Sequence, residues 1–286
     1  MLGWKPSTRL RFRFGNGRLV QIAEVELSEK RMSFWEHLDE LLSRLRIIFI
    51  SVIASGFLIG FWPADPRGFL DPTGLYRPII SVVMHRMRSD LLPAGARLIA
   101  GGLMDTAYVY ITLSFLIGIV VSSPLIGYQL YAFINPALYP QERRYISKFL
   151  LAFLGLFTFG VVMAYYLMLP LTFRIIVWFI ESGGAEPLIN IQDFYNMIIT
   201  LMVGSGLLYT APVFIVLLVQ AGILPANFIS GKRKLMYVGF LVVTAVITPD
   251  PTIITDIIIM LPFIIIFESA VLAARRIERK RAKSTG

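Results

Sequence analysis

Long apolar runs separated by short charged islands dominate this sequence. A helix needs about 20 apolar residues to cross a hydrocarbon layer of roughly 30 Å. With this length as a guide, six runs are the best count of spans, at about residues 47–62, 107–131, 145–180, 194–219, 235–248 and 253–274. The pattern therefore predicts an all-α integral membrane protein with six transmembrane helices.

Three of the predicted spans depart from standard length. The third run is too long for one upright crossing, so we expect tilt, a projecting end, or a kink at Pro170. The fifth has about 14 apolar residues, and only the tight turn PDPT separates it from the sixth. We therefore expect spans five and six to be short. The segment between spans one and two, residues 63–105, predicts an ordered cap with one or two short helices.

Composition and charge agree with a membrane protein and suggest its orientation. Of the 286 residues, 56% are hydrophobic and only 16% are charged, whereas soluble domains are about a quarter charged. Twenty-one lysines and arginines fall on the side of the two termini and five on the other. Because cytoplasmic loops carry the basic excess, both termini are predicted to be cytoplasmic. This also accounts for the net charge of +9 without a nucleic-acid partner.

Several kinds of chemistry find no support in the residues. There is no cysteine, and the two histidines, His37 and His85, lie far apart, so we expect neither a metal site nor a cofactor. The sequence lacks a GxxxxGK[ST] phosphate-binding loop and a plausible nucleophile–base pair. We therefore do not expect an enzyme.

The segment SFWEHLDELLSRLR, residues 33–46, places acids just before the first span of a basic protein. Ser33 and Glu36 form a capping-box pattern that marks a helix start. Apolar residues follow one face at helical spacing: Phe34, Leu38, Leu41 and Leu45. Acidic and polar residues follow the other: Glu36, Asp39, Glu40 and Ser43. The pattern predicts an N-terminal amphipathic helix; periodicity alone is satisfied by an interfacial helix without a binding role.

A second acidic position lies in NPALYPQERRY, residues 135–145, the loop between spans two and three. Glu142 follows Pro140 at the expected start of the third span, where an acid stabilises the helix macrodipole. Beyond Glu40, the predicted cytoplasmic face has only two acids, Glu142 and Glu278, among many cations. A carboxylate in such surroundings suits recognition of a guanidinium through two parallel hydrogen bonds.

These segments resemble the TatC family, the multi-spanning subunit of the twin-arginine protein translocase. The resemblance covers roughly residues 33–276. It rests on SFWEHLDEL followed by Arg44 and Leu45, YQLYAFINPALYPQERR, YYLMLPL, the turn ITPDP and LPFIIIFE. Six spans with both termini inside is also the architecture of that family.

The resemblance implies a receptor and core subunit that recognises twin-arginine signal peptides of folded precursors. It implies export driven by the proton-motive force across a bacterial or archaeal cytoplasmic membrane. The two acids that receive the arginine pair in the family correspond to Glu40 and Glu142. The full set of positions implied for signal-peptide binding is Glu40, Glu142, Arg44, Phe133, Pro136, Leu138, Arg143 and Arg144.

The resemblance also implies partner proteins and shows departures from the family. Single-span TatA/TatB-type subunits, further copies of this chain and membrane lipid are the expected partners. The positions implied for partner-subunit contact are Tyr209, Thr210, Asp250 and Glu268. Leu42 stands where the family usually has arginine. The segment LLYTAP in span four lacks the acid or amide that many members carry there.

The resemblance divides the chain into three parts. We expect an N-terminal cytoplasmic extension at 1–32, a six-span domain at 33–276 and a basic cytoplasmic tail at 277–286. An alternative interpretation is a proton- or ion-coupled small-solute transporter, which would require charges buried within the spans. The candidates for such charges are Arg174, Asp193 and Asp256.

Overall fold

The computed structural model describes residues 34–64, 77–134, 146–247 and 253–285. The chain divides into two units, Met1–Glu40 and Leu41–Gly286. The described part of the first unit is the beginning of helix α1 (Phe34–Phe61). The predicted amphipathic segment and the predicted first span are therefore parts of one continuous helix.

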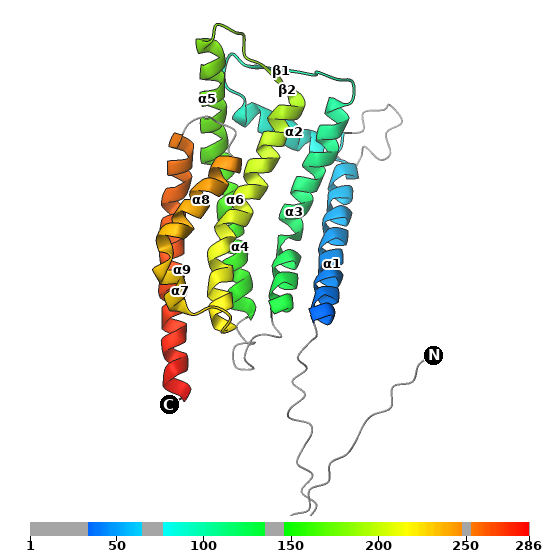
Figure 1. Ribbon diagram of the computed structural model, residues 1–286. Helices are drawn as coiled ribbons and strands as arrows, with labels where there is room; N and C mark the ends of the chain where they lie inside the picture. The colour runs from blue at the N-terminus through cyan, green and yellow to red at the C-terminus, as the bar shows by residue number, and fades with distance from the viewer. Residues whose placement is uncertain (1–33, 65–76, 135–145, 248–252, 286) are drawn as a thin grey trace, which may run out of the picture. The chain divides into compact units, whose positions relative to one another are not determined.

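Helices make up most of the second unit, and the predicted all-α class is confirmed (Figure 1). One short sheet of two three-residue strands accompanies them in the described chain. After α1 the elements are α2 (Ile79–Leu91), β1 (Arg97–Ile99), α3 (Asp105–Ile134), α4 (Ile146–Met163), a π-helical segment (Ala164–Met168), α5 (Leu169–Ser182), β2 (Leu188–Asn190), α6 (Ile191–Gln220), α7 (Ala226–Gly231), α8 (Arg233–Ile247) and α9 (Ile253–Thr285).

Five helical stretches of the described chain are long and apolar enough to cross a membrane. They are Trp35–Phe61, Asp105–Ile134, Ser147–Ser182, Ile191–Gln220 and Asp256–Arg279. These stretches coincide with predicted spans one, two, three, four and six. Helix α8, at the fifth position, has 15 residues and is about 22 Å long at 1.5 Å per residue. The count of six spans stays a prediction.

Helix α9 extends beyond the predicted sixth span, whose length in the membrane stays a prediction. It has 33 residues, and its candidate membrane stretch has 24. Beyond Ala274 the sequence continues with arginine, glutamate, lysine and alanine, which favour helix, and no glycine or proline interrupts it before Gly286. The helix therefore runs on without a break through residue 277, where the basic tail was expected to begin.

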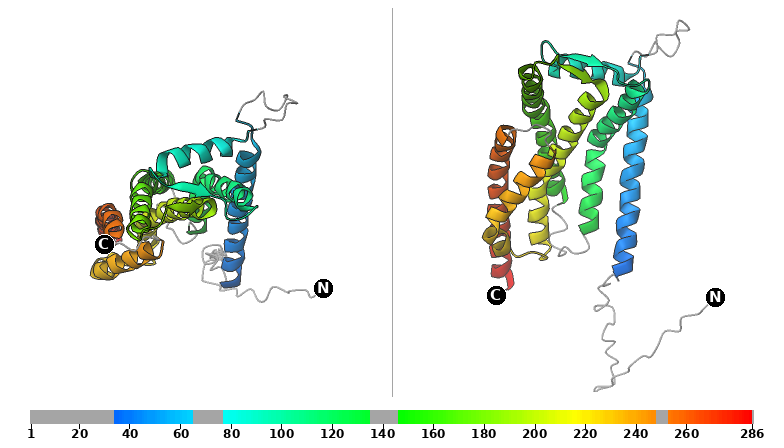
Figure 2. Two further views of the ribbon diagram at one scale, coloured as in Figure 1. Left: turned by 90° about the horizontal axis from the view of Figure 1, so that it is seen from above. Right: turned by 45° about the horizontal axis from the view of Figure 1, so that its top comes forward.

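Helix α6 is the centre of the second unit, in contact with α3, α4 and α9 (Figure 2). Its contact with α4 is unusually close at Gly160, where an added Cβ atom would lie 2.5 Å from the Ser205 carbonyl oxygen and 2.9 Å from the Gly206 Cα. In lipid, helices gain little from hydrophobic burial against one another, so small residues that allow close packing support their association.

Helix α1 packs against α3 by the same means. An added Cβ atom at Gly118 would lie 2.8 Å from the Val52 carbonyl oxygen and 3.0 Å from the Gly56 Cα. The Ser55 hydroxyl is 3.1 Å from the Gly118 carbonyl oxygen and 3.0 Å from the Ser122 hydroxyl. Small side chains and hydroxyl groups thus hold α1 and α3 together within an apolar stretch.

The long third run is one helical stretch with a π-helical turn in it. The turn, Ala164–Met168, comes just before Pro170, which lies in the first turn of α5. A proline lacks the N–H group for the helix ladder, and its ring crowds the carbonyl group four residues earlier. The wider π turn accommodates this defect. The sequence predicted tilt, a projecting end or a kink at Pro170; the π turn was not predicted.

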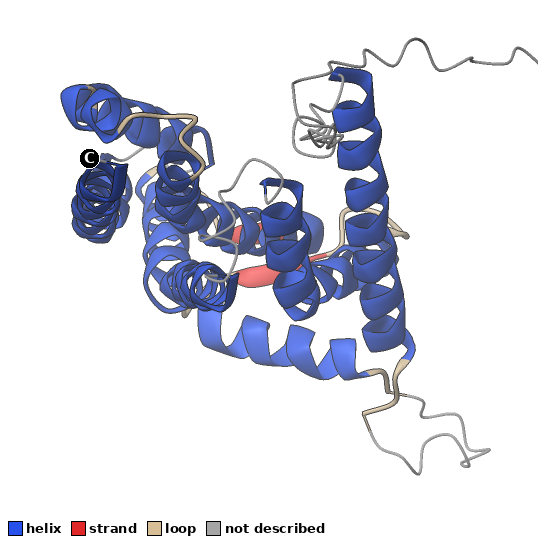
Figure 3. Ribbon diagram, turned by 90° about the horizontal axis from the view of Figure 1, so that it is seen from below, coloured by secondary structure: helices blue, strands red, loops and turns tan. Residues whose placement is uncertain are grey.

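Helix α2 lies crosswise at one end of the long helices, close to the two strands (Figures 1 and 3). We call this end, formed by α2, β1 and β2, the cap end. The strands pair in parallel, with Leu98 opposite Ile189. The Asp105 carboxylate accepts hydrogen bonds from the Gly101 and Gly102 amides and the Asn190 side chain. An ordered cap with a short helix was predicted; the parallel strand pair was not.

Replacing Gly160 by alanine should destabilise the protein by about 1–3 kcal/mol, because the new methyl group meets the backbone of α6 and forces the helices apart. Thermal unfolding of the purified protein in detergent measures the loss. Gly155→Ala is the matched control. Gly155 lies on the same helix, and a methyl group added there meets no atom within 4 Å. Equal unfolding temperatures for the two variants would contradict the proposed close packing.

Candidate functional site

The signal-peptide positions named from the sequence fall partly outside the described residues. Glu40, Arg44 and Phe133 are described. The other five, Pro136, Leu138, Glu142, Arg143 and Arg144, lie in residues 135–145, outside the described ranges. The described part of this candidate site is therefore Glu40 by itself and, in the second unit, the helices that flank residues 135–145.

Glu40 lies on the second turn of α1 and faces His37. The Nδ1 atom of His37 is 4.0 Å from the Oε2 atom of Glu40, a contact that is ionic when the imidazole is protonated. The Glu40 side chain is 16% exposed, against 48% for His37. The two side chains, three residues apart, share one face of the helix.

Arg44 joins α1 to α3 in the second unit. Its Nη1 atom donates to the Oε1 atom of Gln129 over 3.3 Å, and Gln129 is buried. Buried amides require hydrogen-bond partners, so the arginine satisfies one that α3 carries into the interface. Sequence reasoning gave Arg44 a binding role and missed Gln129, although a lone amide inside an apolar run was a visible signal.

An aromatic cluster fixes the helices on both sides of residues 135–145. Tyr131 on α3 lies 5.4 Å, between ring centroids, from Phe149 on α4. Phe149 and Phe153 both make edge-to-face contacts with Phe214 on α6, at 5.9 Å and 6.0 Å. Phe133, the described aromatic residue of the candidate site, is half-buried on the last turn of α3. The end of α3 and the start of α4 are therefore held against α6.

Two of the residues named for partner-subunit contact are buried inside the second unit. The Tyr209 hydroxyl on α6 donates to the Ile259 carbonyl oxygen of α9 over 2.7 Å, and its ring packs edge-on against Phe159. The Thr210 hydroxyl donates to the Leu207 carbonyl oxygen over 2.6 Å. These contacts stabilise α6 and its packing on α9; their part in binding another subunit stays a prediction.

Glu268 links α9 to α8. Its Oε2 atom is 3.1 Å from the Nη1 atom of Arg233, and its Oε1 atom accepts a hydrogen bond from the Tyr237 hydroxyl. The rings of Phe240 on α8 and Phe263 on α9 also stack between these two helices. The carboxylate thus joins a cation and a hydroxyl from the first two turns of α8. Asp250, the remaining residue of this predicted group, lies outside the described residues.

Of the three charged residues that a solute transporter would need inside its spans, two are exposed and one is buried. Arg174 on α5 and Asp193 on the first turn of α6 are exposed. Asp256 is buried, on the first turn of α9, where a carboxylate is favoured by the helix macrodipole. Within the described ranges, no three His, Asp or Glu side chains are grouped so as to hold a metal ion.

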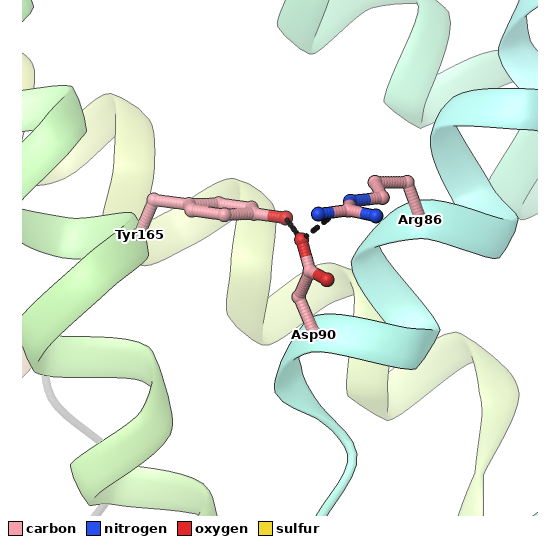
Figure 4. A network of polar contacts seen from close by, with 3 residues as sticks. All are labelled: Arg86, Asp90 and Tyr165. Carbon is pink, nitrogen blue, oxygen red and sulfur yellow. Dashed lines mark hydrogen bonds and ion pairs between the residues drawn. The ribbon is translucent and has the colours of Figure 1, made fainter.

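One polar group at the cap end was missed by the sequence reasoning (Figure 4). Asp90 on α2 accepts from the Tyr165 hydroxyl over 2.8 Å and from the Nε atom of Arg86 over 3.0 Å. Arg86 and Asp90 are four residues apart, a spacing that predicts a helical ion pair. Nothing in the spacing pointed to Tyr165, which lies in the π-helical turn. The group ties α2 to the third long run.

The sequence matches a known family over most of its length. Residues 36–262 match the family model described as "Sec-independent protein translocase protein (TatC)". The TatCy protein of Bacillus subtilis is 30% identical over 255 residues, which cover 89% of this chain and 93% of the relative. The TatC protein of Aquifex aeolicus is 28% identical over 253 residues, covering 87% and 98%.

The fold matches a solved structure as well. A crystal structure described as the twin-arginine translocase receptor TatC superposes with a TM-score of 0.66. It is 24% identical in sequence, and the match covers 85% of this chain and 99% of that one. The arrangement of helices is therefore shared.

Glu268→Gln should destabilise the protein by about 1–3 kcal/mol, because it removes a charge-assisted hydrogen bond between α8 and α9. Glu278→Gln is the control: it makes the same chemical change on α9, at a residue without an ion pair to the described chain. A double-mutant cycle with Arg233→Gln, measured by unfolding in detergent, isolates the pair. A coupling energy near zero would show that the two side chains do not stabilise each other.

Proposed function

We propose that this chain, which belongs to the TatC family of Sec-independent protein translocase proteins, is the translocase subunit that receives twin-arginine signal peptides. In this role it binds the signal of a folded precursor at the cytoplasmic membrane and organises export driven by the proton-motive force. The chain performs no catalytic step. The observation that carries the proposal is the family match over residues 36–262, which includes both Glu40 and Glu142.

The chemistry of the two acids supports this role. A guanidinium group is planar and always charged, and it pairs with a carboxylate through two parallel hydrogen bonds. Two carboxylates on separate segments can each take one arginine of a pair. Lysine cannot make the same bidentate contact, so the arrangement favours Arg–Arg over Lys–Lys. Phe133, Pro136 and Leu138 supply apolar contacts, while Arg44, Arg143 and Arg144 complete the proposed binding surface.

The packing of the second unit suits a receptor of this kind. The Arg44–Gln129 hydrogen bond keeps α1 beside α3, and the contact between Tyr131 and Phe149 joins α3 to α4. Both contacts lie near the helix ends that residues 135–145 connect. A surface supported by fixed helices loses less conformational entropy when it binds a peptide.

The proposal includes partner subunits and an orientation. Single-span TatA/TatB-type proteins and further copies of this chain would contact spans four to six, near Tyr209, Thr210, Asp250 and Glu268. Both termini would lie in the cytoplasm, and α8 would be the fifth of six spans. At 15 residues it is shorter than a typical crossing, a mismatch that the bilayer meets by thinning.

Glu142→Gln and Glu40→Gln should each reduce export of a twin-arginine precursor by about tenfold or more, since each removes a charge-assisted contact worth roughly 1.5–3 kcal/mol. Transport assays in inverted membrane vesicles measure the loss, and immunoblotting of the membranes checks insertion. Glu36→Gln is the control, because Glu36 lies on the same helix as Glu40. Export at wild-type rates in both site variants would exclude the arginine-pair receptor.

Crosslinking separates recognition from later steps of transport. A photoreactive residue beside Glu40 or Glu142 should label an Arg–Arg signal peptide strongly and the matched Lys–Lys peptide weakly. Equal labelling of the two peptides would count against the proposed chemistry even if export fails in the glutamine variants.

The absence of cysteine from the sequence makes topology directly measurable. A single cysteine at Ala185, near the cap end, should react with a membrane-impermeant maleimide in intact cells. One at Asn227, on α7, should react only after permeabilisation. A cysteine at Thr248 should behave like the one at Ala185 if α8 crosses the membrane; reaction like Asn227 would reduce the count to five spans.

A further inference from the structure

A cavity of about 350 Å³ lies at the cap end. Its walls come from one face of α2, from β1 and the residue after it, and from the first turns of α3 and α6. Protein pockets that hold small molecules commonly measure about 300–1,000 Å³. The cavity is therefore large enough for a small polar group with part of an apolar chain.

Hydrogen-bond donors gather in the wall of this cavity. Arg88 and His85 line it from α2, and Thr106 and Tyr110 line it from α3. Among the described residues, none of these four side chains makes a hydrogen bond or an ion pair. No Asp or Glu is among the lining residues. A wall with a guanidinium group, free donors and no carboxylate attracts an anion.

Two further hydroxyl groups in the wall are committed to the fold. Ser81 donates to the Pro78 carbonyl oxygen over 2.8 Å, and Tyr195 donates to the Met84 carbonyl oxygen over 2.8 Å. The Tyr195 bond fixes α2 on α6. The donors that remain for a ligand are thus the arginine, the imidazole and the hydroxyl groups of α3.

The cavity is formed before any ligand arrives. Strand β1, which supplies part of the wall, is held in place by its parallel pairing with β2. The Asp105 carboxylate holds the turn between β1 and α3 to the start of α6 through Gly101, Gly102 and Asn190. Because the walls are already fixed by these contacts, little ordering opposes binding.

The rest of the wall is apolar and lies next to membrane-spanning helices. Met84, Leu98, Ile99 and Ile191 contribute to it, and α3 and α6 are both candidate spans that begin here. An anion that also carries apolar chains, at the level where helices enter the bilayer, has the chemistry of a phospholipid.

We propose that this cavity is a phosphate-binding site anchored by Arg88, occupied by the phosphate of a phospholipid headgroup whose chains lie along α3 and α6. Arginine pairs with phosphate through two parallel hydrogen bonds, and Tyr110 and Thr106 donate further bonds to its oxygens. The site lies at the cap end, and its occupation does not depend on the receptor role of Glu40 and Glu142.

Native mass spectrometry of the full-length protein in detergent, titrated with short-chain phosphatidylglycerol, tests the site. Arg88→Gln should weaken binding by about tenfold or more, because it removes a charge-assisted contact. Tyr110→Phe should weaken it by a smaller factor. Arg77→Gln is the matched control: this exposed arginine precedes α2 and is outside the cavity lining. Arg77→Gln should bind like the wild type.

A second arm distinguishes the source of the phosphate. Inorganic phosphate at millimolar concentration should leave the bound lipid in place if the apolar wall contributes. Displacement of the lipid, with phosphate binding that also depends on Arg88, would keep the site but make free phosphate its ligand.

The result that overturns the proposal is equal affinity of Arg88→Gln and Arg77→Gln for both probes. If Arg88→Gln does not fold, Tyr110→Phe and Thr106→Ala decide, and wild-type affinity in both would equally overturn it.

Discussion

The packing of α4 on α6 is the contact on which the rest of the second unit depends. Helix α6 touches α3, α4 and α9, so its position sets theirs. The approach is possible because Gly160 has no side chain to meet the backbone at Ser205 and Gly206. Once the helices are this close, the aromatic rings of Phe149, Phe153 and Phe214 fill the space between them. In a solvent without water, such steric fit replaces much of the hydrophobic drive that holds soluble proteins together.

Much of the fold follows from the sequence, because the bilayer imposes a minimum length on apolar helices. Four predicted spans, the first, second, fourth and sixth, agree with long helices of the structure. The third agrees as well, but the π turn before Pro170 could not be placed, since a proline allows several local responses. The extent of α9 was underestimated, because hydropathy marks where a span ends and says nothing of a helix that continues in water.

Contacts between distant segments were beyond the reach of sequence reasoning. The pairing of β1 with β2 involves three residues on each strand, too few for an alternation to show. The bond from Tyr165 to Asp90 depends on how α2 lies across the third run. The signal-peptide positions came from resemblance to a family rather than from geometry. The hydrogen bond from Arg44 to Gln129 shows that a residue assigned to binding can also join two helices of the fold.

The strand pair at the cap end imposes an order on biosynthesis. Strand β1 precedes α3, whereas β2 follows α5, so the ribosome must make the second and third long helical runs before β1 has a partner. Until then the backbone groups of β1 lack their partners on β2, and Asp105 lacks the Asn190 side chain. The cap is therefore completed late, after both of these long helical runs have been synthesised.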